Sequence, residues 1–86
     1  MKVNKKVYII TYHDEYSNGE CYSGISYVFD SLEKARKMLE QIKQDEIAEY
    51  KENGYDITND IKLENDTLTK DSGDFSEYKI IESQVK

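Results

Sequence analysis

The 86-residue sequence contains no proline, one cysteine and one histidine. A single cysteine cannot close an internal disulfide, so nothing in the chain calls for an oxidising compartment. One histidine and one cysteine cannot form a zinc site without further ligands. Phosphate-cradling glycine loops and nucleophile-elbow motifs are also missing. We therefore predict a protein that is not an enzyme and that uses no cofactor or metal.

Long hydrophobic runs are absent as well. The N-terminal MKVNKKVYII is basic and then apolar. Its apolar run is too short for a signal peptide or a membrane span. We expect a cytoplasmic protein, and the length together with the lack of repeats predicts one domain over residues 1–86.

Two segments near the N-terminus have the composition of strands. KVYIITYH (6–13) and ECYSGISYVF (20–29) are rich in β-branched and aromatic residues. Asn18-Gly19 lies between them, and this dipeptide favours a type I′ hairpin turn because both residues tolerate positive φ. With these two residues at the centre of the turn, the expected cross-strand pairs are Tyr12–Ile25, Ile10–Tyr27 and Tyr8–Phe29.

A helix is predicted over residues 31–52. Apolar residues recur at helical spacing from Leu32 to Tyr50. Asp30 or Ser31 is suited to the N-cap, and Asn53-Gly54 is a typical C-terminal stop. A third strand is expected around 57–63, a polar turn-like segment over 66–74 and a last strand over 75–85. The predicted class is α+β: an antiparallel sheet of order β-β-α-β-β with one long helix on one face.

One helix covers only one face of such a sheet. Branched aliphatic residues pack well beneath a helix. We therefore predict that the face covered by the helix carries Val7, Ile9, Val28 and Ile81. The open face would then carry Tyr8, Tyr12, Tyr27 and Phe29, which would form a dimer or ligand surface because a monomer rarely exposes so large an aromatic patch. The opposite assignment of the two faces stays open.

His13 and Cys21 are the residues that could suggest nucleophilic chemistry. In the register above they are not a cross-strand pair, and nearby acids would disfavour a thiolate. We interpret Cys21 as a small, partly buried residue. The twelve residues 66–77 resemble a calcium loop in length only, because Leu68 and Lys70 occupy ligand positions.

The net charge of −6 is concentrated in one segment. Residues 44–77 carry eleven acidic and three basic side chains, a sum of −8. Three acids in the helix and one after it follow at spacings of four, three and four, which would place them on one helical face. Repulsion between the carboxylates of this row disfavours a helix. The presence of the row therefore suggests that its residues bind a partner. The predicted partner-binding residues are Asp45, Glu49, Glu52, Tyr50, Tyr55, Asp56 and Asp60.

The segment 7–43 resembles small uncharacterised bacterial and phage proteins of a ββα type. The residues that carry the resemblance are Val7-Tyr8-Ile9, Val28-Phe29, Ser31 and Glu33-Lys34-Ala35. The resemblance implies a fold and no catalytic residues. In composition the whole chain is loosely similar to acidic phage-encoded inhibitors of bacterial defence, including anti-CRISPR proteins, and suits an AT-rich Firmicute or its phages.

Our leading hypothesis is a small acidic binding protein that occupies a basic nucleic-acid-binding site on a host protein such as a defence nuclease. It implies a basic protein partner, with no direct binding of nucleic acid and no membrane. One alternative is a homodimer whose open-face tyrosines sequester a small molecule or nucleotide. Another is an accessory protein.

Overall fold

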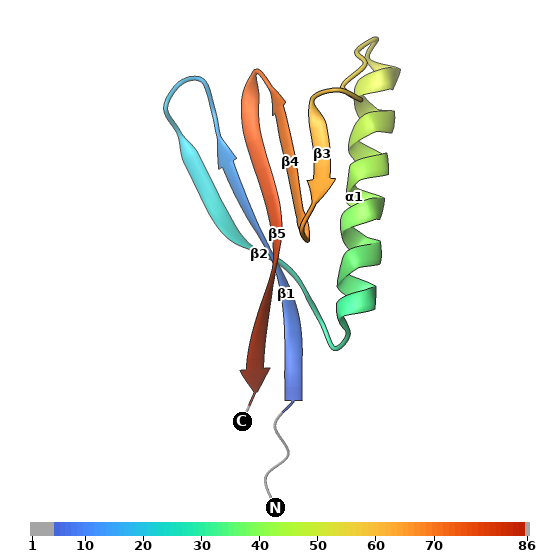
Figure 1. Ribbon diagram of the computed structural model, residues 1–86. Coiled ribbons are helices and arrows are strands. Elements are labelled where there is room, and N and C mark those ends of the chain that lie inside the picture. Colours follow the sequence, from blue (N-terminus) through green and yellow to red (C-terminus); the bar gives the residue numbers. More distant parts are fainter. Residues whose placement is uncertain (1–4, 86) are drawn as a thin grey trace, which may run out of the picture.

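The computed structural model describes residues 5–85 and shows one five-stranded antiparallel sheet with one long helix on one face of it (Figure 1). The sheet order is β2-β1-β5-β4-β3. This confirms the predicted α+β class with its single long helix. The chain after the helix forms three strands, however, where two were expected. The elements are β1 (Lys5–Glu15), β2 (Cys21–Phe29), α1 (Leu32–Glu52), β3 (Ile61–Glu64), β4 (Thr67–Ser72) and β5 (Asp74–Val85).

The β1–β2 hairpin has a different turn from the one predicted. The Tyr16 amide donates to the Glu20 carbonyl (2.8 Å), and the Gly19 amide donates to the Tyr16 carbonyl (2.9 Å). The loop therefore has three residues, with only Gly19 at positive φ (91°), as in a type I turn followed by a glycine bulge.

This three-residue loop shifts the register by one residue near the turn. Tyr12 lies opposite Gly24, so the predicted Tyr12–Ile25 pair is wrong. A bulge beyond Thr11 restores the expected register. The predicted pairs Ile10–Tyr27 and Tyr8–Phe29 are confirmed.

Helix α1 begins and ends almost where the sequence predicts. Ser31 is the N-cap, and its hydroxyl accepts from the Lys34 amide (3.4 Å). Asp30 instead binds the Lys34 ammonium (3.0 Å). At the other end, Gly54 has φ of 84° and the Tyr55 amide donates to the Tyr50 carbonyl (2.9 Å), which is the pattern of a Schellman C-cap.

Most of the segment predicted as a polar turn is strand β4. It pairs with β3 through a two-residue turn, Asn65-Asp66, in which both residues have positive φ (52° and 59°). Asparagine and aspartate tolerate this conformation. The third strand starts at Ile61 and not at residue 57, because residues 58–60 form a turn of their own.

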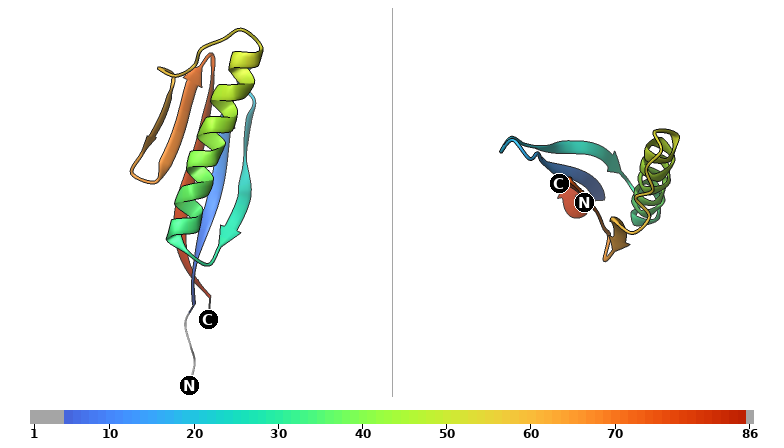
Figure 2. Two further views of the ribbon diagram at one scale, coloured as in Figure 1. Left: turned by 90° about the vertical axis from the view of Figure 1, so that its right-hand side faces the viewer. Right: turned by 90° about the horizontal axis from the view of Figure 1, so that it is seen from above.

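The helix covers the sheet face that was predicted to be open (Figure 2). Val28 and Ile81 are exposed on the other face, so their placement beneath the helix was wrong. The error follows from the missed strand β4, which places Leu68 opposite Tyr78 and so adds its apolar residues to the aromatic face. The buried core residues in contact are Ile10, Ala35, Leu39, Ile42, Ile61 and Leu68.

The molecule is elongated, with principal extents of 56 × 27 × 19 Å. Its radius of gyration is 14.8 Å, whereas a compact chain of this length has about 12 Å. The excess comes from β1 and β5, whose paired ends run beyond the helix (Figure 1). The core is therefore short, and much of the sheet lies outside it.

Candidate functional site

The predicted partner-binding residues fall into two neighbouring groups. Asp45, Glu49 and Glu52 lie on the second half of α1, and all three are exposed. The remaining four gather where the helix ends, around the loop that leads to β3. The row of four carboxylates is therefore not one helical face, because α1 ends at Glu52 before Asp56 is reached.

The C-terminal turn of the helix positions the second group. The Schellman bond from the Tyr55 amide reverses the chain direction, and the Tyr55 ring is left 66% exposed. The Asp56 carboxylate then accepts from the Thr58 hydroxyl and from the Thr58 amide (3.0 Å). These two bonds lower the pKa of Asp56, the hydroxyl bond having the larger effect.

An open hollow of about 390 Å³ lies at this end of the molecule. Four predicted residues and Ile57 line it; the four are Tyr50, Tyr55, Asp56 and Asp60. Ile57 is buried (2% exposed) and fixes the loop. The hollow therefore combines an exposed aromatic ring with two carboxylates.

Some acids of the helix are ion-paired and others are not: Glu46 pairs with Lys70 (3.2 Å), whereas no ion pair in residues 5–85 involves Glu40. In the first half of the helix, Glu33 pairs with Lys37 (3.5 Å), and Asp30 before it pairs with Lys34 (3.0 Å). Among residues 5–85, no ion pair involves any acid of the predicted site: Asp45, Glu49, Glu52, Asp56 and Asp60. The negative charge at this end of the helix is therefore open to an external cation.

Tyr50 is less available than Tyr55, because Lys70 of β4 holds it. The Lys70 ammonium donates to the Tyr50 hydroxyl (3.2 Å) and to Glu46 Oε2 (3.2 Å), and lies 4.7 Å from the Tyr50 ring centroid. The Lys70 side chain is only 12% exposed. The sequence did not reveal this cluster, because it depends on β4, which was not predicted.

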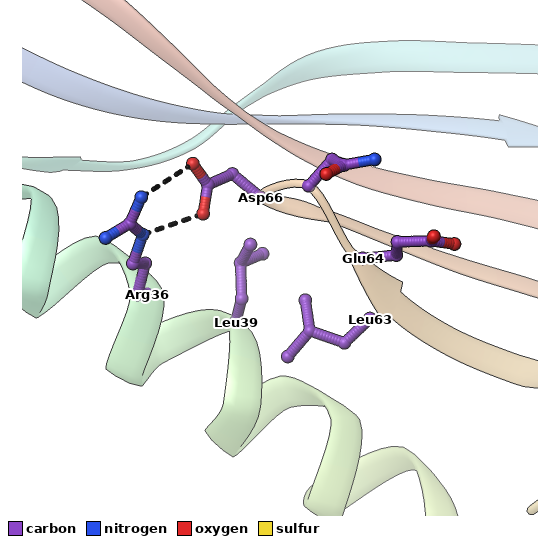
Figure 3. A pocket seen from close by; sticks show the side chains of 6 residues that line it. Arg36, Leu39, Leu63, Glu64 and Asp66 are labelled. Carbon is purple, nitrogen blue, oxygen red and sulfur yellow. Dashed lines mark hydrogen bonds and ion pairs between the residues drawn. The ribbon is translucent and has the colours of Figure 1, made fainter.

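A second hollow, of about 270 Å³, lies between the helix and the β3–β4 turn (Figure 3). Arg36 reaches across it and binds the Asp66 carboxylate with two nitrogens (2.8 and 3.2 Å). The hydrogen bond to Arg36 lowers the pKa of Asp66. Because the paired charges satisfy each other, we interpret this hollow as a structural contact between helix and hairpin.

His13 and Cys21 lie on the same sheet face but are not directly paired. His13 lies opposite Ser23 and Cys21 opposite Glu15, so the two are diagonal neighbours on the ladder. The expectation that they are not a cross-strand pair is therefore confirmed. Cys21 is exposed, not partly buried as predicted. Over residues 5–85, no group of three or more metal-ligating side chains was found.

The predicted aromatic surface is largely covered. Tyr8 and Phe29 pack against the core beneath the helix. Tyr12 is partly buried, and its ring occupies the space where a side chain at Gly24 would lie. Tyr27 is the most open of the four at 43% and stacks on Phe29 with centroids 6.0 Å apart.

No protein family matches this chain, and comparisons with curated proteins and with solved structures give no match either. Within the described part of the chain, no helix is long and apolar enough to cross a membrane.

Proposed function

We propose that the chain is a non-enzymatic binding protein whose acidic end docks on a basic protein surface. The acidic end comprises Asp45, Glu49 and Glu52 on α1 together with Tyr55, Asp56 and Asp60 after it. A protein that binds through this end acts by occupancy and needs no catalytic group.

One observation carries the proposal: the charge of the acidic end is exposed and has no ion pair within residues 5–85, whereas Glu33 at the start of the same helix and Asp30 just before it are paired. Carboxylates near a helix C-terminus oppose the macrodipole, and like charges three or four residues apart repel. Residues that weaken the helix in this way are better explained by a partner than by folding.

The partner class follows from the spacing of these charges. Asp45, Glu49 and Glu52 recur every three to four residues, which is about 4.5–6 Å along the axis. A regular row of negative groups resembles the phosphates of a nucleic acid strand, and a groove rich in Lys and Arg accepts either. The proposed partner is therefore a nucleic-acid-binding protein, and the chain would act as its inhibitor.

The test uses three tagged proteins as baits in a bacterial lysate: the unaltered chain, an acidic-end variant and a control variant. The acidic-end variant carries Asp45→Lys, Glu49→Lys and Glu52→Lys. The control carries Glu15→Lys, Glu40→Lys and Glu82→Lys, which are exposed positions elsewhere. Both variants change the net charge from −6 to 0. Asp56 is left unchanged because its bonds to Thr58 shape the loop.

We expect the unaltered chain and the control to retain the same basic protein, and duplex DNA or RNA to release it. The acidic-end variant should lose it. Binding should weaken with added salt, because attraction between exposed charges is screened. Equal losses from both variants would mean that only net charge matters, and retention by the acidic-end variant would contradict the proposed site.

A further inference from the structure

The two edges of the sheet differ in how well they are protected. At one edge, β3 has only four residues and carries Lys62 and Glu64. At the other, β2 has nine residues, Cys21–Phe29, without a charge or a proline. Edge strands normally carry charges or proline because their free backbone groups otherwise pair with another chain. Apart from its bulge, β2 has none of these protections.

Exposed apolar side chains also concentrate on β2. Of the seven large apolar or aromatic side chains that are exposed in residues 5–85, four belong to this strand. Ile25 (64%) and Val28 (58%) lie on the open face, and Tyr22 (52%) and Tyr27 (43%) lie on the helix side. A partner at this edge would therefore bury apolar surface on both faces of the sheet.

The hairpin bonds show which backbone groups are free. The bond from the Tyr16 amide to the Glu20 carbonyl starts the ladder between β1 and β2. Because bonded and non-bonded pairs alternate in an antiparallel ladder, Cys21, Ser23 and Ile25 direct their backbone groups away from β1. These groups form a row of donors and acceptors at the free edge.

We propose that β2 pairs with β2 of a second copy of this chain, in antiparallel orientation about a two-fold axis, to form a continuous ten-stranded sheet. A second copy is favoured over other occupants because the edge is uncharged. Two chains of net charge −6 repel each other, and this strand lets their backbones meet with no charged side chain inside the paired segment Cys21–Phe29. The acidic end lies on the second half of α1 and on the loop that leads to β3, which is the edge strand opposite β2.

The bulge in β2 fixes the register of this pairing. Opposed side chains must share a face, and the bulge at Ser26 reverses the alternation of sides along the strand. With a two-fold axis between Ile25 and Ser26, opposed side chains share a face both before and after the bulge. This axis places Tyr22 opposite Phe29 and Ser23 opposite Val28 of the other copy.

This register brings two complementary features together. A surface hollow of about 360 Å³ adjoins the C-terminal end of β2 and is lined by Phe29, Lys34, Lys37, Met38 and Gln41. Tyr22 of the other copy would lie beside it, with its ring against Phe29 and Met38. The Tyr22 hydroxyl donates to Glu20 (2.9 Å), so Glu20 of the other copy would approach Lys34 and Lys37, which already pair with Asp30 and Glu33. The same contact occurs twice, as a two-fold interface requires.

Sedimentation equilibrium across the micromolar range tests the proposal. The unaltered chain should be a dimer. Ile25→Lys should weaken the dimer at least about tenfold, because it places two charges near the axis. The matched control is Ile81→Lys, an exposed residue of the same face on the inner strand β5, which should leave the dimer unchanged. Circular dichroism of each variant checks that the fold survives.

A monomer at every concentration would overturn the proposal. So would a dimer that Ile25→Lys leaves intact, or one that both lysine variants weaken equally.

Disulfide formation then tests the register. In a Cys21→Ser background, Ser23→Cys with Val28→Cys should form a crosslinked dimer under mild oxidation, because opposed Cα atoms in such a pair are about 5.5 Å apart, within disulfide range. Ser23→Cys alone should not crosslink, since its own counterpart lies five residues along the strand. Efficient crosslinking of Ser23→Cys alone, or none with the pair, would overturn the proposed register.

Discussion

Replacing Glu46 alone should destabilise the protein more than replacing Glu46 and Lys70 together. Lys70 Nζ lies 3.2 Å from Glu46 Oε2 and 3.2 Å from the Tyr50 hydroxyl, and its side chain is 12% exposed. Glu46→Ala leaves this ammonium beneath the helix with the tyrosine as its remaining partner. Glu46→Leu with Lys70→Met removes both charges and keeps the volume filled.

The magnitude follows from burial. Breaking a fully buried ion pair costs about 3–5 kcal/mol. Glu46 retains 24% exposure, so water reaches the pair in part, and we expect about 1.5–3 kcal/mol for Glu46→Ala. The double replacement should stay within about 1 kcal/mol of the unaltered protein, because it leaves no unpaired charge. A chain of this size has about 4–13 kcal/mol of stability in all.

The pH dependence has a definite sign. Burial alone lowers the pKa of Lys70, but the bond to Tyr50 and the charge of Glu46 outweigh it, and the pKa is raised above its usual 10.5. The stabilisation from this raised pKa is fully present below pH 10.5 and is lost as the pH rises through the folded-state pKa. The variant without Glu46 should show a smaller loss over that alkaline range.

Urea unfolding at neutral pH gives the free energies, and the single variants Glu46→Leu and Lys70→Met complete a double-mutant cycle. The reasoning is refuted if Glu46→Ala costs less than about 0.5 kcal/mol, the usual range of a surface substitution. It is also refuted if the double replacement costs as much as Glu46→Ala.

Three further predictions concern the fold and use thermal or urea unfolding. Ser31→Ala should cost about 1 kcal/mol because it removes the N-cap bond, whereas Asp30→Ala should change stability less, because its pair with Lys34 is exposed to solvent; a larger effect at Asp30 would make it the true cap. Gly19→Val should cost about 1–2 kcal/mol, since φ at Gly19 is 91°, and an unchanged melting temperature would contradict the glycine-bulge turn. Leu68→Ala should cost about 2–5 kcal/mol because Leu68 is 1% exposed, while Ile81→Ala, on the open face, should cost about 1 kcal/mol or less; the reverse order would mean that the helix covers the other face.

Local signals in the sequence were sufficient for the helix and the first hairpin. Periodic apolar residues and a cap at Asp30 or Ser31 predict a helix from residue 31, one residue before α1 begins, and Asn53-Gly54 predicts its end, because caps and stops act within a few residues. The turn near Asn18-Gly19 was also correctly located. Its type was not, because a three-residue loop and a two-residue loop both accept a glycine at positive φ.

The candidate site was predicted in part. The sequence singled out the acidic segment, and the structure brings Tyr50, Tyr55, Asp56 and Asp60 around one hollow. The Schellman turn creates this arrangement. It ends the helix before Asp56, so Asp56 does not continue the row of carboxylates on α1. The exposed strand β2 was visible in the sequence as nine residues without a charge, yet only the sheet order places it at an edge.

By itself, the sequence determined what depends on neighbours along the chain: the helix and its caps, the location of the first hairpin turn, and the acidic segment. Tertiary structure alone decided which face of the sheet is buried. That choice depends on β4, a polar strand stabilised by its two neighbours and by the buried side chain of Leu68. Once β4 pairs with β5, Leu68 joins Ile10 and Ile61 on the face of Tyr8 and Phe29. The helix covers that face because the face then has the larger continuous apolar area. This area is contributed by several strands that are distant in sequence, so it cannot be read from any one of them.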